Sequence, residues 1–192
     1  MRIGVDLDDV TIDFINPLLR FHNETAKKVI SYQDVFTYTL EKVWGGTRQE
    51  AIDKIRAFYI SDNFDQLKPI DGAVESLLDL SQKHDITFIT AIHNESREKT
   101  QRWLERTLPF LKAPVFYIGE YNNNDERKVS KAEVCLREGI ELIIEDNGKY
   151  ATDCIQKGVR AYLFNRPWNT KFLDPRLVRV NAWREVLEHL AQ

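Results

Sequence analysis

Residues 3–10, Ile3-Gly4-Val5-Asp6-Leu7-Asp8-Asp9-Val10, decide the fold class of this chain of 192 residues. A short apolar run at residues 3–5 leads directly into three aspartates. An apolar run without alternating polar residues is typical of a strand buried on both faces, as in a parallel sheet. Asp6 and Asp8 are two residues apart, so on an extended strand their side chains point to the same side. The stretch therefore predicts a buried first strand with two neighbouring acids at its carboxyl end.

Four more apolar runs of this kind follow, at residues 86–89, 115–118, 142–144 and 161–164. Apolar residues at helical spacing lie between and after them, at residues 74–78, 132–136, 151–155 and 183–190. The capping box Ser130-x-x-Glu133 predicts where the second helix begins, and Gly139 and Gly158 predict where the second and third end. Asp71 is the expected cap of the first. Strands alternating with helices predict an α/β fold with a Rossmann-like parallel sheet and right-handed crossovers.

Residues 14–70 break this alternation, since they contain no convincing strand. Phe14, Leu18 and Phe21 share one helical face, and a second capping box, Thr47-x-x-Glu50, precedes another helical pattern. We therefore expect a core of residues 1–13 and 71–192 and a small helical insertion of residues 14–70 after the first strand. The insertion is rich in aromatic residues. Most of them are expected to form its own small core, and a minority to contact a ligand.

Composition narrows the class of protein. Hydrophobic residues make up 43% and charged residues 30% of the chain, which is typical of a folded globular protein. A net charge of −3 gives no reason to expect a nucleic-acid polymer or an anionic membrane as partner, although a small phosphorylated ligand remains compatible with it. No apolar run reaches the roughly 20 residues of a membrane helix, and no signal peptide precedes the first strand. We expect a cytoplasmic protein, with Cys135 and Cys154 as buried reduced thiols.

Ligands of an open parallel sheet bind beyond the carboxyl ends of its strands, so the residues at those ends are the candidates for a site. Thr90 ends the second strand, Glu145 and Asp146 follow the fourth, and Lys131 begins the helix between the third and fourth. Each acid alone could cap a helix or lie in a solvated loop. Acids at successive strand ends, together with a hydroxyl group and a lysine, instead predict one functional cluster.

The chemistry of these side chains suits a metal-assisted phosphoryl transfer. Oxygen ligands from Asp6, Asp8 and Asp146, with open positions for water and phosphate, fit Mg²⁺. A phosphoryl group in transfer carries charge on its oxygens, and Thr90 and Lys131 can supply a donor and a cation. Asp6 can attack phosphorus as a nucleophile, while Asp8 can donate a proton to the leaving oxygen.

These residues, Asp6-Leu7-Asp8-Asp9-Val10, Thr90, Lys131 and Glu145-Asp146, resemble in their order the four motifs of the haloacid dehalogenase superfamily of phosphohydrolases. The resemblance spans positions 6 to 146. It implies a Rossmann-like core with a cap inserted after the first motif, which agrees with the helical insertion. It also implies a phosphoaspartyl intermediate on Asp6, Asp8 as acid and base, and Mg²⁺ held by the Asp6 side chain, the Asp8 carbonyl and Asp146.

Two stretches narrow the resemblance. Gly4-Val5-Asp6-Leu7-Asp8 with Asp13-Phe14, and Leu163-Phe164-Asn165-Arg166-Pro167-Trp168-Asn169, are similar to the 5′(3′)-deoxyribonucleotidase family. This similarity implies that Phe14 contacts a nucleotide and that aromatic residues of the cap shape a pocket for the base. The most favoured substrate is then a nucleoside monophosphate.

The chain also departs from these families. Asp9 replaces the glycine usual after the second aspartate, and it could alter the turn toward the insertion or add an acid near the site. Ala91 follows Thr90, where animal nucleotidases tend to have another hydroxyl. Lys128 is an alternative to Lys131 as the third motif. Arg166 and Trp168 fit a structural loop as well as they fit a site.

Other functions compete with a nucleotidase. A phosphatase for another small metabolite, such as a sugar phosphate, would use the same residues. A phosphoacceptor domain of the receiver type also combines acids, a threonine and a lysine, but its phosphorylated aspartate ends a later strand. A catalytically silent binding protein is disfavoured by the complete set of motif residues. His93, just beyond Thr90, is expected at the surface or in a cap rather than at the substrate. The sequence leaves open whether the chain forms a homodimer.

Overall fold

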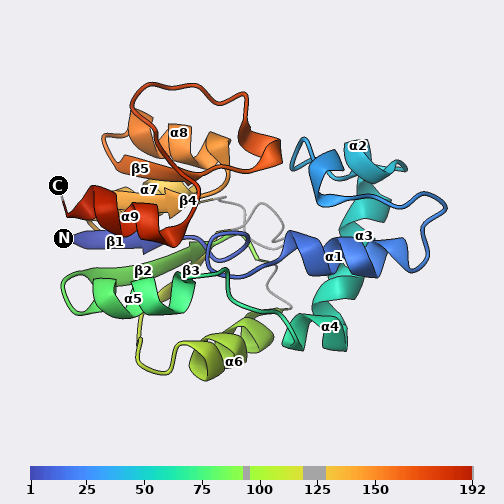
Figure 1. Cartoon of the computed structure of the whole chain (residues 1–192), viewed down its shortest axis with the longest axis horizontal. Coiled ribbons are helices and arrows are strands. Elements are labelled where there is room, and N and C mark those ends of the chain that lie inside the picture. The colour runs from blue at the N-terminus through green and yellow to red at the C-terminus, as the bar shows by residue number, and fades with distance from the viewer. Residues whose placement is uncertain (93–95, 119–128, 192) are drawn as a thin grey trace.

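The fold is a parallel sheet with helices on both faces, seen in a computed structural model that describes residues 1–92, 96–118 and 129–191. In these residues six strands form one sheet in the order β3-β2-β1-β4-β5-β6, and every neighbouring pair is parallel (Figure 1). The strands are β1 (Arg2–Val5), β2 (Asp85–Thr90), β3 (Val115–Tyr117), β4 (Leu142–Glu145), β5 (Arg160–Phe164) and β6 (Val178–Val180). The five predicted strands are confirmed, and β6 was not foreseen.

Alternate residues of the strands face two separate clusters of buried side chains. Leu142 and Ile144 of β4 belong to the larger cluster, which is covered by α5 (Ala73–Ser81), α6 (Arg97–Thr107) and α9 (Trp183–Leu190). Ile143 belongs to the smaller cluster, under α7 (Lys131–Arg137) and α8 (Gly148–Gln156). Cys135 and Cys154 lie buried in that smaller cluster as free thiols, as predicted. No helix in the described parts of the chain has both the length and the apolar character needed to cross a membrane.

Most of the predicted helix ends are confirmed, and one is wrong. The Ser130–Glu133 capping box precedes α7, and Gly139 (φ 64°) and Gly158 (φ 84°) follow α7 and α8 in left-handed conformations. Asp71 does not cap α5. That helix begins at Ala73 after Gly72, whose φ of 78° suits a residue without a side chain. The Ala73 N–H donates to the Ile70 carbonyl (2.9 Å), so a tight turn takes the place of a side-chain cap.

Residues 14–70, called here the helical segment, contain helices and no strand. They form α1 (Ile15–Asn23), a 3-10 helix η1 (Tyr32–Asp34), α2 (Glu41–Trp44), α3 (Arg48–Ile60) and α4 (Asp62–Asp65). The predicted Thr47–Glu50 capping box opens α3. These helices lie beyond the carboxyl ends of the strands, at the right of Figure 1. The division of the chain at residues 14 and 70 into two domains stays a prediction.

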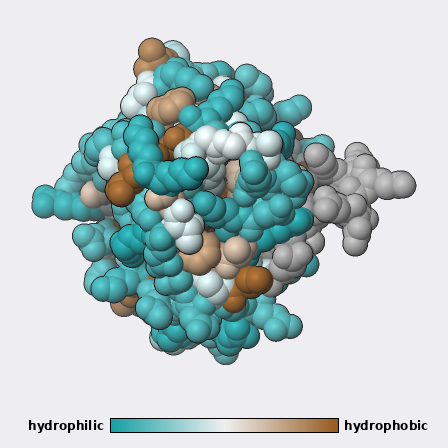
Figure 2. All heavy atoms as spheres, turned by 90° about the vertical axis from the view of Figure 1, so that its right-hand side faces the viewer, coloured by the Kyte–Doolittle hydropathy of each residue, from teal (hydrophilic) through white to brown (hydrophobic). Residues whose placement is uncertain are grey.

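Aromatic rings form much of the interior of the helical segment. Phe58 lies at their centre, in contact with Phe14, Phe21 and Phe64 at ring-centroid distances of 5.5, 5.6 and 6.4 Å. The outer face of the molecule on this side is mostly hydrophilic, with scattered hydrophobic residues (Figure 2). The aromatic residues of the segment are therefore largely used within it, as the sequence predicts.

The chain enters and leaves the helical segment at one place, just above β1. The N–H groups of Thr11 and Ile12 both donate to the Leu7 carbonyl (2.9 and 2.8 Å), which closes a tight loop after the strand. Ile12 pairs with Pro69 in an antiparallel bridge, beside the returning chain. The Trp183 indole N–H of α9 donates to the Val10 carbonyl (2.8 Å) and so anchors the loop to α9. These contacts fix the start of α1 relative to the first strand.

Candidate active site

Three buried acids meet at the carboxyl edge of the two central strands. Asp6 follows β1, while Glu145 ends β4 and Asp146 follows it. The strands are paired there, with the Asp6 N–H donating to the Ile144 carbonyl (3.0 Å). One oxygen from each of the three side chains lies within 4.8 Å of the others. The parallel register of β1 and β4 thus brings together acids about 140 positions apart in the sequence, as the strand-end argument predicts.

Lys131 lies against this cluster from the first turn of α7. Its Nζ is 2.7 Å from Asp6 Oδ1 and 2.7 Å from Glu145 Oε2, and only 1% of its side chain is exposed. Burial opposes the charge, but the carboxylates of Asp6 and Glu145 outweigh it and raise the pKa of Lys131. The remaining Glu145 oxygen accepts the Asn147 N–H (3.1 Å), so both oxygens of this acid are engaged. Lys131 occupies the place expected for the predicted lysine, while Lys128 lies outside the described residues.

Asp8 lines the same pocket but is held more loosely than Asp6. Its Oδ1 is buried without a hydrogen-bond partner among the described residues, and its Oδ2 is 3.5 Å from the Tyr59 hydroxyl. Burial, followed by the charges of Asp6, Asp9 and Asp146, raises the pKa of Asp8 well above its usual range. A carboxyl group in this setting favours its protonated form and can act as a proton donor.

Asp146 is held by donors from two distant parts of the chain. Its Oδ2 accepts the Trp168 indole N–H (2.8 Å) and the Tyr38 hydroxyl (3.1 Å), and its carbonyl accepts the Asn169 amide (2.6 Å) and the same Tyr38 hydroxyl. Burial and the Asp6 charge raise the pKa of Asp146 to about 7. Trp168 and Asn169 follow β5, the neighbour of β4. Their place just after a strand is the sequence signal that could have predicted their position near Asp146. Tyr38 had no such signal.

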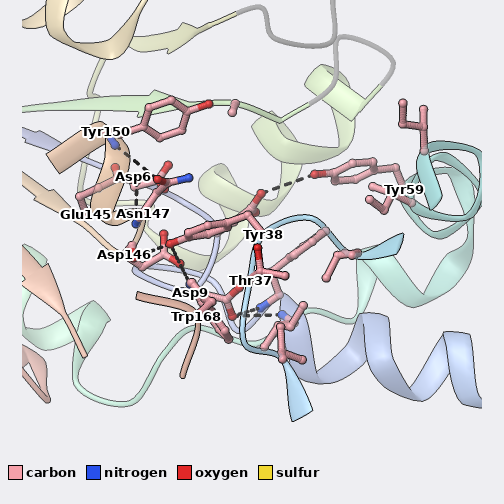
Figure 3. Close-up of a pocket in the computed structure, with 18 of the residues that line it drawn as sticks. Asp6, Asp9, Thr37, Tyr38, Tyr59, Glu145, Asp146, Asn147, Tyr150 and Trp168 are labelled. Atoms are coloured by element: carbon pink, nitrogen blue, oxygen red, sulfur yellow. Dashed lines mark hydrogen bonds between the residues drawn. The ribbon is translucent and has the colours of Figure 1, made fainter. Parts of the chain in front are cut away.

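The pocket has an acidic floor and an apolar wall (Figure 3). The wall comes from the helical segment, where Phe14 stacks on Tyr59 with ring centroids 5.4 Å apart and Ile52 and Ile55 lie alongside. The floor comes from the loops after β1 and β4. The cavity encloses about 190 Å³. Phe14 therefore lines the pocket that holds the carboxylates, and its contact with a substrate stays a prediction.

Thr90 does not join this arrangement. Thr90 ends β2 as predicted, but it is fully buried and its Oγ1 accepts the Ile92 N–H (3.1 Å). Its neighbour Ala91 lines the pocket, whereas Thr90 does not. His93 lies outside the described residues.

Asp9 shapes the turn toward the helical segment and also lines the pocket, so both predicted alternatives describe its position. Its backbone is left-handed, with φ 56°. Its Oδ1 accepts the N–H groups of Phe14 (3.3 Å) and Ile15 (3.0 Å) at the start of α1. The Arg166 guanidinium donates twice to the Asp9 carbonyl, at 3.1 Å from Nε and 2.6 Å from Nη2. Arg166 thus supports the loop that carries the acids, and Trp168 reaches the pocket itself.

The donor set fits a hard divalent cation. Four carboxyl groups, from Asp6, Asp8, Glu145 and Asp146, gather near the buried ammonium of Lys131. Their excess negative charge contributes to the raised pKa values of Asp8 and Asp146, and a cation among oxygen ligands would offset it. Glu145 also lies within the geometric cluster. Since Lys131 and Asn147 already engage both of its oxygens, we regard Asp6 and Asp146 as the available side-chain ligands.

The chain is similar to known proteins in both sequence and fold. Over residues 1–192 the chain matches the family of 5′ nucleotidase, deoxy (pyrimidine), cytosolic type C proteins. The chain belongs to this family. As a member of this nucleotidase family it is a phosphatase-type hydrolase, and the predicted recognition of a haloacid dehalogenase-like nucleotidase is confirmed.

Relatives of this nucleotidase family member are found among bacterial proteins. A candidate nucleotidase of Halalkalibacterium halodurans is 26% identical over 96% of this chain and 89% of its own length. Another, from Bacillus subtilis, is 25% identical over 98% of this chain and 92% of its own length.

Solved structures agree in fold. A haloacid dehalogenase family hydrolase from Deinococcus radiodurans, with bound phosphate and sodium, has a TM-score of 0.71 and 12% identity, covering 99% of this chain and 94% of that one. A haloacid dehalogenase-like hydrolase from Streptococcus pneumoniae has a TM-score of 0.68 and 13% identity, covering 98% and 97%. The predicted fold class, a parallel Rossmann-like sheet of the haloacid dehalogenase type, is confirmed.

Proposed function

We propose that this chain is a Mg²⁺-dependent phosphomonoesterase that hydrolyses nucleoside monophosphates through a phosphoaspartyl intermediate on Asp6. One observation carries the proposal. Asp6, Asp8 and Asp146 line one part of a pocket, with Lys131 buried against Asp6. Mostly apolar and aromatic side chains of the helical segment line another part. A phosphate group suits the first part and a nucleoside suits the second.

Asp6 and Asp8 divide the chemistry between them. Lys131, 2.7 Å from Asp6 Oδ1, holds in place the side chain that attacks phosphorus. Asp8, whose raised pKa favours its protonated form, donates its proton to the leaving ester oxygen as the phosphorus–oxygen bond breaks. Asp8 then takes a proton from the water that hydrolyses the aspartyl phosphate. Two carboxyl groups in different surroundings thus act as nucleophile and as acid or base.

Binding of the phosphate falls to the groups around Asp6. Bound Mg²⁺, held by the Asp6 side chain, the Asp8 carbonyl and Asp146, would neutralise charge on the phosphate. Lys131 has a third N–H beyond the two directed at Asp6 and Glu145, and we assign it to a phosphate oxygen. We assign Thr90 to the same phosphate, since a hydroxyl that accepts the Ile92 N–H can still donate its own hydrogen, although Thr90 must first become accessible from the pocket.

The wall formed by Phe14 and Tyr59 favours a nucleoside over a sugar as the group that carries the phosphate. An aromatic surface stacks well on a planar base, whereas a sugar phosphate presents hydroxyl groups that need polar partners. The names of the bacterial relatives point to the same substrate class. We therefore place the base against Phe14.

A substrate panel tests this function. The purified protein would be assayed with nucleoside 5′- and 3′-monophosphates, sugar phosphates and a chromogenic aryl phosphate, each with Mg²⁺ and with a chelator. We expect kcat/KM for the best nucleotide to exceed that for the sugar phosphates by at least ~10-fold, and turnover to disappear with the chelator. Nucleotide turnover no better than that of the aryl phosphate would contradict the assignment.

The nucleophile is tested by Asp6→Asn. Turnover should fall by at least ~10³-fold, because the amide cannot form the phosphoaspartyl intermediate. Asp79→Asn is the matched control, since Asp79 lies on α5, away from the pocket, and its side chain forms an exposed ion pair with Lys83. Circular dichroism of both variants would verify the fold. Wild-type turnover in Asp6→Asn would refute the mechanism.

A further inference from the structure

The Tyr38 side chain crosses from the helical segment to the acidic edge of the sheet. It lies in the loop between η1 and α2, and its hydroxyl shares one hydrogen between the Oδ2 and the carbonyl oxygen of Asp146 (Figure 3). Its ring packs edge-on against Trp168, with centroids 6.0 Å apart. Tyr38 therefore contacts both the proposed metal ligand and the indole that supports it.

The other donors to Asp146 have a different origin. Trp168 and Asn169 belong to the short 3-10 helix after β5, and Asn169 also donates to the Phe164 carbonyl (2.7 Å) at the end of that strand. Their positions are set by the sheet. Among the described donors to Asp146, Tyr38 alone comes from residues 14–70. The contact at Tyr38 consequently depends on where the helical segment lies relative to the sheet.

The cavity is small for the substrate proposed above. The cavity of about 190 Å³ is smaller than the roughly 300–1,000 Å³ of typical small-molecule sites. A nucleotide of the kind proposed above needs the helical segment to stand further from the sheet as it enters. Such a displacement separates the Tyr38 hydroxyl from Asp146, and the return of the segment restores the contact.

We propose that Tyr38 is a positioning residue that links closure of the helical segment to Mg²⁺ binding at Asp146. Trp168 and Tyr38 both donate to Oδ2, so the other carboxylate oxygen, Oδ1, is left to face the ion. The inference rests on the proposed function, because it takes Asp146 as a ligand of Mg²⁺. Linkage makes the effect reciprocal: closure strengthens Mg²⁺ binding by the same factor by which Mg²⁺ favours closure.

The test compares Tyr38→Phe with a matched control, Tyr32→Phe. Tyr32 lies in the same segment and packs edge-on against Trp168 at 5.5 Å, but it donates no hydrogen bond to Asp146 in the described structure. Isothermal titration of the full chain with Mg²⁺, without substrate, should show about 10-fold weaker binding for Tyr38→Phe. Tyr32→Phe should remain within about twofold of the wild type, because Asp146 keeps all its donors.

Hydrogen exchange supplies a readout of closure itself. Saturating Mg²⁺ should increase amide protection in residues 31–44 of the wild type and of Tyr32→Phe, but not of Tyr38→Phe. Equal Mg²⁺ affinity in Tyr38→Phe and wild type, or an unchanged protection response, would overturn the role of Tyr38 and leave the proposed hydrolase intact. A wild type without Mg²⁺ affinity would overturn both the proposed metal site and this inference.

Discussion

Asp9 combines an unfavourable backbone with favourable contacts. Its φ of 56° lies in the left-handed region, which disfavours residues with a side chain. Its carboxylate accepts two backbone N–H groups at the start of α1, so it caps that helix from several residues upstream. Arg166 holds its carbonyl in the same turn. An aspartate can therefore replace glycine here, because its side chain accepts hydrogen bonds from the start of α1 that glycine cannot accept.

Substitution at position 9 separates these two effects. Asp9→Ala and Asp9→Gly both remove the capping carboxylate and its charge, but only glycine relieves the left-handed backbone. We expect Asp9→Gly to be more stable than Asp9→Ala by about 1 kcal/mol in urea-unfolding measurements. Equal free energies of unfolding for the two variants would show that the backbone at position 9 is not strained.

At the scale of elements, the segment between β5 and β6 packs closely on the start of α8. Gly148 is the first residue of α8, and a Cβ placed there would lie 2.2 Å from Phe172 Cδ2. The same segment carries Trp168 and Asn169, which hold Asp146. Glycine at position 148 thus lets the supports of Asp146 approach the helix that follows it.

A double-mutant cycle tests this packing. Gly148→Ala should lower the free energy of unfolding by about 1–3 kcal/mol, because its methyl group displaces Phe172. Combined with Phe172→Ala, which opens space, the same change should cost less than it does alone. Urea denaturation of the wild type, both single variants and the double variant provides the four values. Strict additivity would contradict the predicted clash.

The sequence predicts the strands that have continuous apolar runs and the helices that have apolar residues at helical spacing. Strand β6 was missed because Val178-Arg179-Val180 is short and places a charged residue at its centre. Helix α6 was missed because, apart from Thr100, Trp103 and Leu104, it lacks buried residues that would mark a helical face. Neither segment shows a clear apolar pattern, so tertiary packing rather than local sequence stabilises these two elements.

The residues of the candidate site likewise fall into those that the sequence predicts and those that it does not. Asp6, Asp8, Asp146 and Lys131 follow strands or open a helix, so topology alone indicates that they meet. The contact between Tyr38 and Asp146 joins residues 108 positions apart, and it depends on how an irregular loop folds back over the sheet. No periodicity or spacing encodes such a contact, which is why the acids could be predicted and one of their partners could not.

The whole molecule concentrates negative charge at one buried edge. Burial raises the pKa of Asp8, Asp9 and Asp146, and mutual repulsion adds to it. Among the described residues, Lys131 contacts Asp6 and Glu145 directly. The Arg166 charge also lowers the pKa of Asp9 and Asp146, but neither cation offsets the effect of burial and repulsion. A divalent cation that binds the folded chain but not the unfolded chain should therefore increase stability.

Metal addition and removal test this expectation. At 100 times the dissociation constant, Mg²⁺ should contribute about 2.7 kcal/mol and raise Tm by roughly 5–10 °C, and a chelator should reverse the shift. Asp146→Asn should lose most of the shift, while Asp79→Asn, on the surface of α5, should keep it. Differential scanning calorimetry at matched ionic strength would measure both. An equal shift in Asp146→Asn would exclude Asp146 as a ligand.

The contacts that hold the loop after β1 also determine when the site can form during synthesis. The carbonyls of Asp9 and Val10 are held by Arg166 and Trp183, which are translated more than 150 residues later. While the chain is still on the ribosome, the first strand and its acids emerge early without these partners. The acids reach their final arrangement only after residue 183 has left the exit tunnel. A nascent chain shorter than this carries the nucleophile but not the structure that holds it in place.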